Sequence, residues 1–131
     1  MMSGMSVATR VYARPTSNES AVHVAILEWI RAVAPDAMPI HVPNEGKRTT
    51  MAGVMAKRLG MVKGVPDLIV FFPHARVLFI EVKDRGAVSK EQRAFGQAVQ
   101  ALGFHWSVCR SIDDARNTFR AIGIQTREAA Q

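Results

Sequence analysis

The sequence predicts an α/β fold in which helices flank a mixed central sheet. Segments with helical spacing of apolar residues alternate with short apolar runs, in the order helix, strand, helix, strand, strand, helix, strand, helix. The two runs in the middle of the chain, residues 67–72 and 77–83, are almost continuously apolar. Such runs are typical of strands that are covered on both faces, so we expect helices on both sides of the sheet.

The first half of the chain contributes two helices and one strand. The first helix begins at Glu19, after a possible N-cap at residue 17 or 18, and ends before Pro35. A strand is predicted over residues 38–42, and a turn cluster over 43–46 closes it. The second helix runs from residue 49 or 50 through Leu59, and Gly60 supplies the left-handed position that follows many helices. The apolar positions that define the first helix are Val22, Ile26, Trp29, Ile30 and Val33.

The second half begins with the central hairpin. A loop with Gly64 leads into the strand that starts near Asp67, residues 72–76 form the turn, and 77–83 form the returning strand. Residues 89–92 have the form of a capping box and open a helix that ends at Gly103. A strand over 104–109 and a helix from Ser111 to Gly123 complete the fold.

Length and composition limit the possible classes of protein. The chain has 131 residues, of which 48% are apolar and 21% charged, as in ordinary globular proteins. We predict one domain over residues 17–123, a flexible N-terminal arm over 1–16, and a polar, frayed C-terminal tail over 124–131. Lys and Arg number 17 against 11 Asp and Glu, which favours a polyanionic partner such as nucleic acid, although charge alone fits a basic protein without one equally well.

The single cysteine, Cys109, excludes an internal disulfide and a thiolate zinc site, and we expect it to be a core residue in a reducing compartment. No apolar stretch approaches the roughly 18 to 20 residues of a membrane span, and no export signal is apparent. We therefore expect a cytoplasmic protein without a membrane partner.

Three charged side chains are predicted to meet at one edge of the hairpin. Asp67 begins the first strand, and Glu81 and Lys83 share a face at the end of its antiparallel neighbour. Phosphodiester hydrolysis needs a metal, a nucleophilic water and a cation near the developing charge. Asp67, Glu81 and the backbone carbonyl of Val82 can bind Mg²⁺. Lys83 can orient the water or bind a phosphate oxygen, and both roles stay open. The alternative is that Asp67 caps a turn while Glu81 and Lys83 form an ordinary surface pair.

Residues around this edge have two interpretations each. Glu19 can join the site or simply complement the dipole of its helix, and His23 lies one turn later on the same face. Gln92 can complete the capping box, position the water bound by the metal, or do both. Asn44, Lys47, Arg48 and Lys63 can bind phosphates, although a solvated surface explains such charges as well.

These residues together resemble the VRR-NUC domain, the virus-type replication-repair nuclease branch of the PD-(D/E)xK superfamily. The resemblance covers about residues 18–122. It is carried by Glu19, Asn44-Glu45-Gly46, Gly60, Gly64-Val65-Pro66-Asp67, Ile80-Glu81-Val82-Lys83, Gly86, Ser89-Lys90-Glu91-Gln92, Gly103 and Arg110-Ser111. The chain departs from the pattern at His23, where Gln is frequent, and at Ala87, where a basic residue is common.

The resemblance implies a restriction-endonuclease-like core and a divalent metal, Mg²⁺ or Mn²⁺, without a nucleotide cofactor. It makes Asp67 and Glu81 metal ligands, Lys83 the catalytic lysine, Glu19 an acid of the site and a further candidate ligand, and Gln92 a polar residue of the site. Stand-alone members are phage or bacterial proteins, expected to be homodimers that cut branched DNA such as Holliday (four-way) junctions in repair and recombination. The rival interpretations are a restriction-type or single-strand nuclease, a non-catalytic nucleic-acid-binding module, and a structural dimer without nucleic acid.

Overall fold

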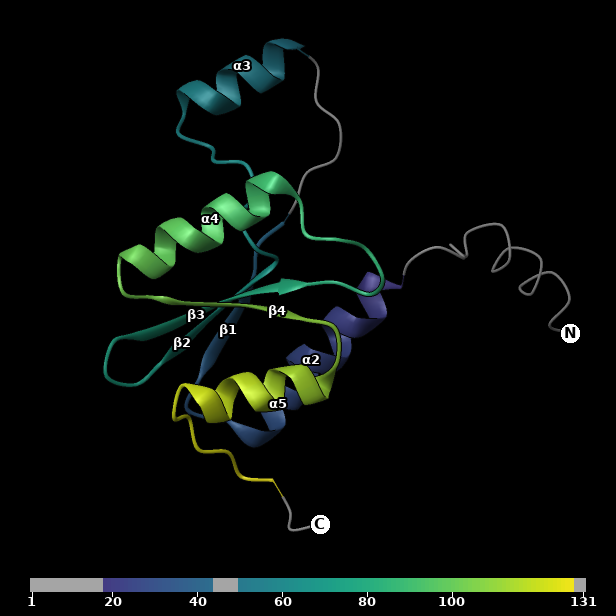
Figure 1. Cartoon of the computed structure of the whole chain (residues 1–131), viewed down its shortest axis with the longest axis vertical. Coiled ribbons are helices and arrows are strands. Elements are labelled where there is room, and N and C mark those ends of the chain that lie inside the picture. Colours follow the sequence, from purple (N-terminus) through teal and green to yellow (C-terminus); the bar gives the residue numbers. More distant parts are fainter. Residues whose placement is uncertain (1–17, 44–49, 129–131) are drawn as a thin grey trace, which may run out of the picture.

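The computed structural model describes residues 18–43 and 50–128, and the elements within them follow the predicted order (Figure 1). Three predictions lie wholly or partly outside the described residues. They are the arm over 1–16, the turn cluster over 43–46, and the candidate DNA-binding residues Asn44, Lys47 and Arg48. The elements are α2 (Glu19–Val33), β1 (Met38–His41), α3 (Thr50–Arg58), β2 (Leu68–Phe72), β3 (Arg76–Val82), α4 (Lys90–Ala101), β4 (His105–Cys109) and α5 (Ile112–Ala121).

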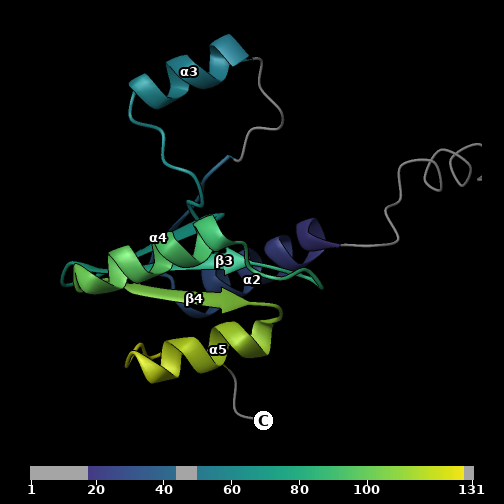
Figure 2. The same ribbon diagram turned by 45° about the horizontal axis from the view of Figure 1, so that its top comes forward.

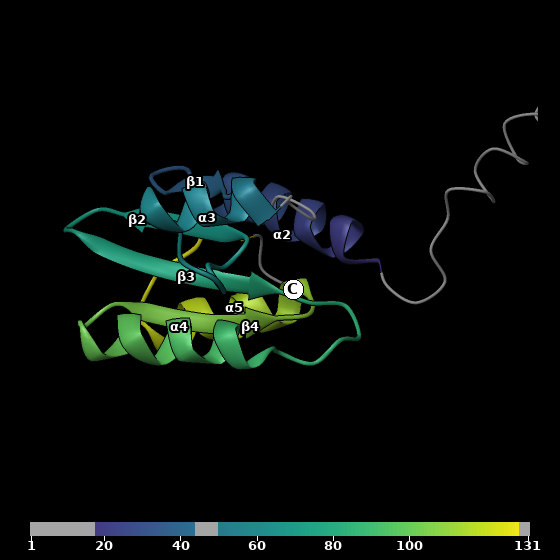
Figure 3. The same ribbon diagram turned by 90° about the horizontal axis from the view of Figure 1, so that it is seen from above.

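The sheet is mixed, as predicted. Its strand order is β1-β2-β3-β4, with antiparallel pairs from β1 to β3 and a parallel pair between β3 and β4. Helix α4 lies on one face of β4 and α5 on the other (Figure 2), and α2 packs against α5 and β1. In the view from above, α4 overlaps α5 beside β4, whereas β1 and α2 lie on the other side of β2 and β3 (Figure 3).

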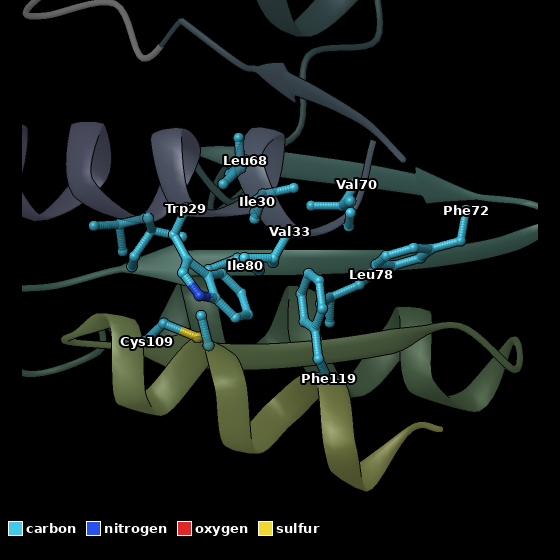
Figure 4. Packing of buried hydrophobic residues seen from close by; sticks show 14 residues of the cluster. Trp29, Ile30, Val33, Leu68, Val70, Phe72, Leu78, Ile80, Cys109 and Phe119 are labelled. Carbon is cyan, nitrogen blue, oxygen red and sulfur yellow. The ribbon is translucent and has the colours of Figure 1, made fainter. Parts of the chain in front are cut away.

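The main core lies between the sheet and the pair α2 and α5 (Figure 4). The apolar stripe of α2 is buried as predicted, with Ile26 and Ile30 fully inaccessible. The Phe119 ring of α5 packs against Trp29 and Phe72, with ring centroids 5.0 and 5.2 Å apart. Every second residue of β2 and β3 enters this layer, namely Leu68, Val70, Phe72, Leu78, Ile80 and Val82. Cys109 is also buried here, as expected.

The opposite face of the sheet packs against α4. Phe79 of β3 contacts Phe95 edge-on, with ring centroids 5.4 Å apart. Gly96 lets the helix approach β4 closely, because a Cβ at this position would lie 2.4 Å from the Trp106 ring. The residues of β3 that point to this face are therefore those with odd numbers, including Glu81.

Helix α3 stands away from the rest of the molecule (Figures 1 and 2). None of its nine residues is buried. The chain returns from α3 to β2 through residues 59–67, and Gly64 fixes this return segment against α4. Gly64 has a φ of +85°, and a Cβ there would lie 2.3 Å from the carbonyl oxygen of Glu91. Only glycine suits this contact without strain.

The prediction of a frayed C-terminal tail is wrong for residues 124–128. The side chain of Ile124 packs against the core, and the backbone N–H of Arg127 donates to the Val33 carbonyl at 2.7 Å. Glu128 accepts hydrogen bonds from Trp29 Nε1 at 2.9 Å and from the guanidinium of Arg116. The polar composition of this segment reflects its bonds to α2 and α5 rather than freedom in solvent.

No helix in the described part of the chain is long and apolar enough to cross a membrane.

Candidate active site

The strand register brings Asp67 and Glu81 together. Leu68 pairs with Ile80 in the antiparallel ladder. Because Asp67 precedes Leu68 and Glu81 follows Ile80, the two acids lie opposite each other. The backbone N–H of Val82 donates to Asp67 Oδ2 at 3.1 Å, which holds this carboxylate beside the end of β3. The predicted meeting of the two acids at one edge of the hairpin is therefore present.

Glu81 is the only charged residue of the described chain that is buried, with 2% of its surface exposed. One oxygen, Oε2, accepts a hydrogen bond from Gln92 Nε2 at 3.0 Å. The other oxygen, Oε1, is buried and has no hydrogen-bond partner among the described residues. A carboxylate oxygen in this position is costly unless a cation or a proton compensates it.

The pKa of Glu81 reflects the same lack of compensation. Burial, followed by the nearby carboxylate of Asp67, raises the pKa of Glu81 to about 8. The charge of Glu19 acts in the same direction, whereas the ammonium of Lys83 lowers this pKa. Without a cation, the Glu81 carboxyl therefore keeps its proton to a higher pH than an ordinary glutamate does.

The donors at this edge fit a hard divalent cation. Oε1 of Glu81 is free to bind one, and Asp67 offers a second carboxylate. In an antiparallel ladder the N–H and C=O of a residue point to the same neighbouring strand, so the Val82 carbonyl points toward Asp67. Among residues 18–43 and 50–128, no three His, Cys, Asp or Glu side chains are arranged to hold a metal by themselves. Two carboxylates completed by backbone, water and phosphate oxygens suit Mg²⁺.

Gln92 completes the predicted capping box, and its side chain also contacts Glu81. Its amide oxygen accepts from the backbone N–H of Ser89 at 2.8 Å, and the Ser89 hydroxyl accepts from the backbone N–H of Gln92 at 3.0 Å. Because the backbone N–H of Ser89 can only donate, the amide oxygen must face it, and the amide NH₂ must face Glu81. The start of α4 is therefore tied to the candidate metal ligand, and the amide contacts Glu81 itself.

Lys83 lies directly beyond β3 and is half-buried. Its backbone N–H donates to the carbonyl of Cys109 at 3.1 Å, which extends the ladder with β4 by one residue. Strand alternation places its side chain on the same face as Glu81. The amine and the two acids thus share one edge of the sheet.

Helix α2 brings Glu19 and His23 toward this edge from its N-terminal end. Glu19 is half-buried in the first turn. The ring of His23 contacts that of His41 edge-on, with centroids 4.8 Å apart. Burial and then the charge of His41 lower the pKa of His23, while the charge of Asp67 raises it. The sequence analysis missed His41, although its place at the end of the strand beside β2 puts it next to Asp67.

A cleft of about 1630 Å³ lies between α3 with its return segment and the start of α4. Lys63 lines one wall and is exposed, and Gln92 lines the other. This cleft therefore connects the one described residue of the predicted DNA-binding set with a residue of the candidate site.

Comparison with known proteins shows the family and the fold of the chain. The family model of the VRR-NUC domain matches residues 17–113. A solved structure described as a VRR_NUC domain protein shares the fold with a TM-score of 0.59 and 21% sequence identity, over 79% of this chain and 85% of that chain. The α/β fold of restriction-endonuclease type that the resemblance implied is confirmed. No curated protein sequence matches the chain.

Proposed function

The chain belongs to the VRR-NUC domain family of PD-(D/E)xK nucleases, and on this premise we propose that it is a metal-dependent endonuclease that hydrolyses phosphodiester bonds in DNA. The observation that carries the proposal is the unpaired, buried oxygen of Glu81 beside Asp67. A divalent cation would compensate the charge of the Glu81 carboxylate once it ionises, and Lys83 lies on the same face.

We assign each side chain a role from its position. Asp67, Glu81 and the carbonyl of Val82 would hold Mg²⁺ or Mn²⁺. When bound, such a cation polarises the phosphate and makes a water molecule more acidic. The ammonium of Lys83 orients that water or donates to a phosphate oxygen, and Gln92 fixes the carboxylate of Glu81 through its amide. Glu19 adds negative charge at the outer side of the site and is a further candidate ligand.

For the substrate, we propose branched DNA such as a four-way junction. The segment over residues 50–66 has three cations, Lys57, Arg58 and Lys63, and no acidic residue. Its charge is complementary to a phosphate backbone, and Lys63 lines the cleft that reaches Gln92. We propose Asn44, Lys47 and Arg48 as further phosphate contacts. The preference for branched over plain DNA rests on the family resemblance.

We further propose that the enzyme is a homodimer and that α3 forms its interface. Isolated helices shorter than about 12 to 15 residues are marginal in water. Helix α3 has nine residues, and none of them is buried. Neither its length nor burial within the described chain therefore accounts for its stability. Helix α3 and the residue that follows it expose apolar side chains three and four residues apart, namely Met51, Val54, Met55 and Leu59, of which the last three also line the cleft. A two-fold axis would pair these faces and present two active sites to the two halves of a junction.

A substrate panel tests the proposed activity. Labelled plain duplex, flap, splayed-arm and four-way junction DNA of the same arms would be incubated with Mg²⁺, with Mn²⁺ and with EDTA. We expect cleavage with either metal, none in EDTA, and a preference for the junction of at least about tenfold. Cleavage in EDTA would contradict metal dependence, and equal cleavage of plain duplex would contradict the junction preference.

The same panel separates the rival functions. Preferential cleavage of duplex at fixed sites, or of single strands, would favour a restriction-type or single-strand nuclease. Salt-dependent DNA binding without cleavage in any metal would favour a non-catalytic binding module. An absence of salt-dependent binding would favour a structural dimer.

A further inference from the structure

Two elements of the candidate site are joined by one hydrogen bond that its chemistry does not use. Oδ2 of Asp84 accepts from the backbone N–H of Asn18 at 2.8 Å. Asp84 directly follows Lys83, and Asn18 directly precedes Glu19. The bond therefore connects the end of β3, which bears the candidate catalytic lysine, to the start of α2, which bears the candidate helix acid.

Asp84 provides the hydrogen-bond acceptor for the backbone N–H of the N-cap residue of α2. Asn18 occupies the N-cap position, as one of the two predicted candidates, but its side chain makes no capping hydrogen bond. The first N–H groups of a helix need acceptors from elsewhere, and a carboxylate there also complements the helix dipole. Asp84, from a neighbouring element, meets this need for the N–H of Asn18 and places a carboxylate at the N-terminal end of the helix.

The loop that carries Asp84 is held firmly at the end of β4. Arg110 Nη1 donates to the carbonyl of Gly86 at 2.9 Å and to that of Asp84 at 3.4 Å. The backbone N–H of Lys83 donates to the Cys109 carbonyl at 3.1 Å. The loop that carries Asp84 is therefore held at the end of the sheet by hydrogen bonds that do not involve α2.

We propose that Asp84 is a positioning residue which, through the backbone of Asn18, holds Glu19 against the Asp67–Glu81 pair. This inference rests on the proposed metal-dependent nuclease, and it assigns Asp84 no contact with the metal or with DNA. Its consequence is that the carboxylate of Asp84 acts only through Glu19. Removing it should move the first turn of α2 and weaken the contribution of Glu19 to the site.

The test compares Asp84→Ala with Asp84→Asn, because the amide oxygen of Asn can still accept from the N–H of Asn18. Binding of Mn²⁺ would be measured from the signal of the free ion in electron paramagnetic resonance, and cleavage in Mg²⁺ from initial rates. We expect Asp84→Ala to weaken both by about 10- to 100-fold, as for other residues that orient metal ligands. For Asp84→Asn, both the Mn²⁺ affinity and the cleavage rate should stay within about threefold of the wild-type values. Asp36→Ala, at an exposed acid in the turn after α2, is the matched control and should change neither.

A double variant tests whether Asp84 acts through Glu19. In a Glu19→Ala background, Asp84→Ala should add less than about a threefold further loss in Mn²⁺ binding and cleavage. The inference is overturned if the two losses multiply, if Asp84→Asn is as weak as Asp84→Ala, or if Asp36→Ala loses as much. A wild-type protein that binds Mn²⁺ and cuts DNA, with Asp84→Ala unchanged, would remove this inference alone. A wild type that does neither would remove the proposed function, and the inference with it.

Discussion

At the scale of single residues, Gln92 connects the fold to the chemistry through the two ends of one amide. The oxygen closes the capping box with Ser89, and the nitrogen holds Glu81. These functions can be separated, because the capping box needs both residues whereas the contact with Glu81 needs only Gln92.

We predict that Ser89→Ala and Gln92→Ala each lower the free energy of unfolding by about 1 kcal/mol, the usual effect of losing an N-cap. Only Gln92→Ala should also reduce cleavage, by about 10- to 100-fold, since it alone frees Glu81. Urea denaturation and initial cleavage rates would measure the two effects. Equal rates in the two variants would show that the amide contact with Glu81 has no catalytic role.

Glu81 makes the stability of the metal-free protein dependent on pH. Its pKa is raised in the folded state to about 8, from an ordinary value of 4.5. The folded protein therefore binds this proton more tightly than the unfolded chain, so the stabilisation is complete below about pH 4.5 and is lost as the pH rises to 8. The lowered pKa of His23 acts in the opposite direction, so the contribution of Glu81 must be isolated by a variant.

We predict that the melting temperature in EDTA falls more steeply between pH 5 and pH 8 in the wild type than in Glu81→Gln, whose amide does not titrate. Added Mg²⁺ should raise the wild-type melting temperature more at pH 8 than at pH 6. At the higher pH, a smaller fraction of Glu81 side chains carries a proton that the metal must displace. Scanning calorimetry over this range checks both effects. Parallel pH profiles for the two proteins would contradict the uncompensated charge at Glu81.

At the scale of the elements, α3 is the one helix of the described chain that has no buried residue, and we propose that a second copy of the chain covers it. We predict that Leu59→Glu weakens dimerisation by at least about tenfold, because it places a charge in the paired apolar faces. Leu102→Glu makes the same change at a leucine of equal exposure, 74% against 79%, outside this surface. Sedimentation equilibrium should show dissociation only in the first variant. Two dimeric variants, or a monomeric wild type, would exclude α3 as the interface.

The elements that the sequence predicted correctly are those in which local pattern and tertiary packing agree. Continuous apolar runs gave β2 and β3, and the short turn between them fixes a register in which Asp67 must face Glu81. The sequence analysis missed features that depend on contacts between distant residues. Trp29 binds Glu128, 99 positions away, and Asp84 binds Asn18, 66 positions away. A periodic pattern in the sequence cannot predict such pairs, because each consists of a single polar contact.

At the scale of the whole molecule, the site lies where several elements end. The hairpin supplies Asp67, Glu81 and Lys83 from one edge of the sheet, α2 reaches this edge from the face of the main core, and α4 reaches it from the other. The large core between the sheet, α2 and α5 makes this edge a rigid support. The candidate site is therefore preorganised by packing that lies away from the reacting groups.

The most direct test of the central claim compares cleavage and binding of a four-way junction by the wild type, Asp67→Asn and Lys83→Ala in Mg²⁺. Both residues are half-buried, and each substitution changes one polar or charged group at the edge of the sheet without opening the core. We predict that each variant loses measurable cleavage while its affinity for the junction stays within several-fold of the wild type, about 1 kcal/mol. Cleavage by either variant at a rate near that of the wild type would contradict the assignment of this edge as the active site.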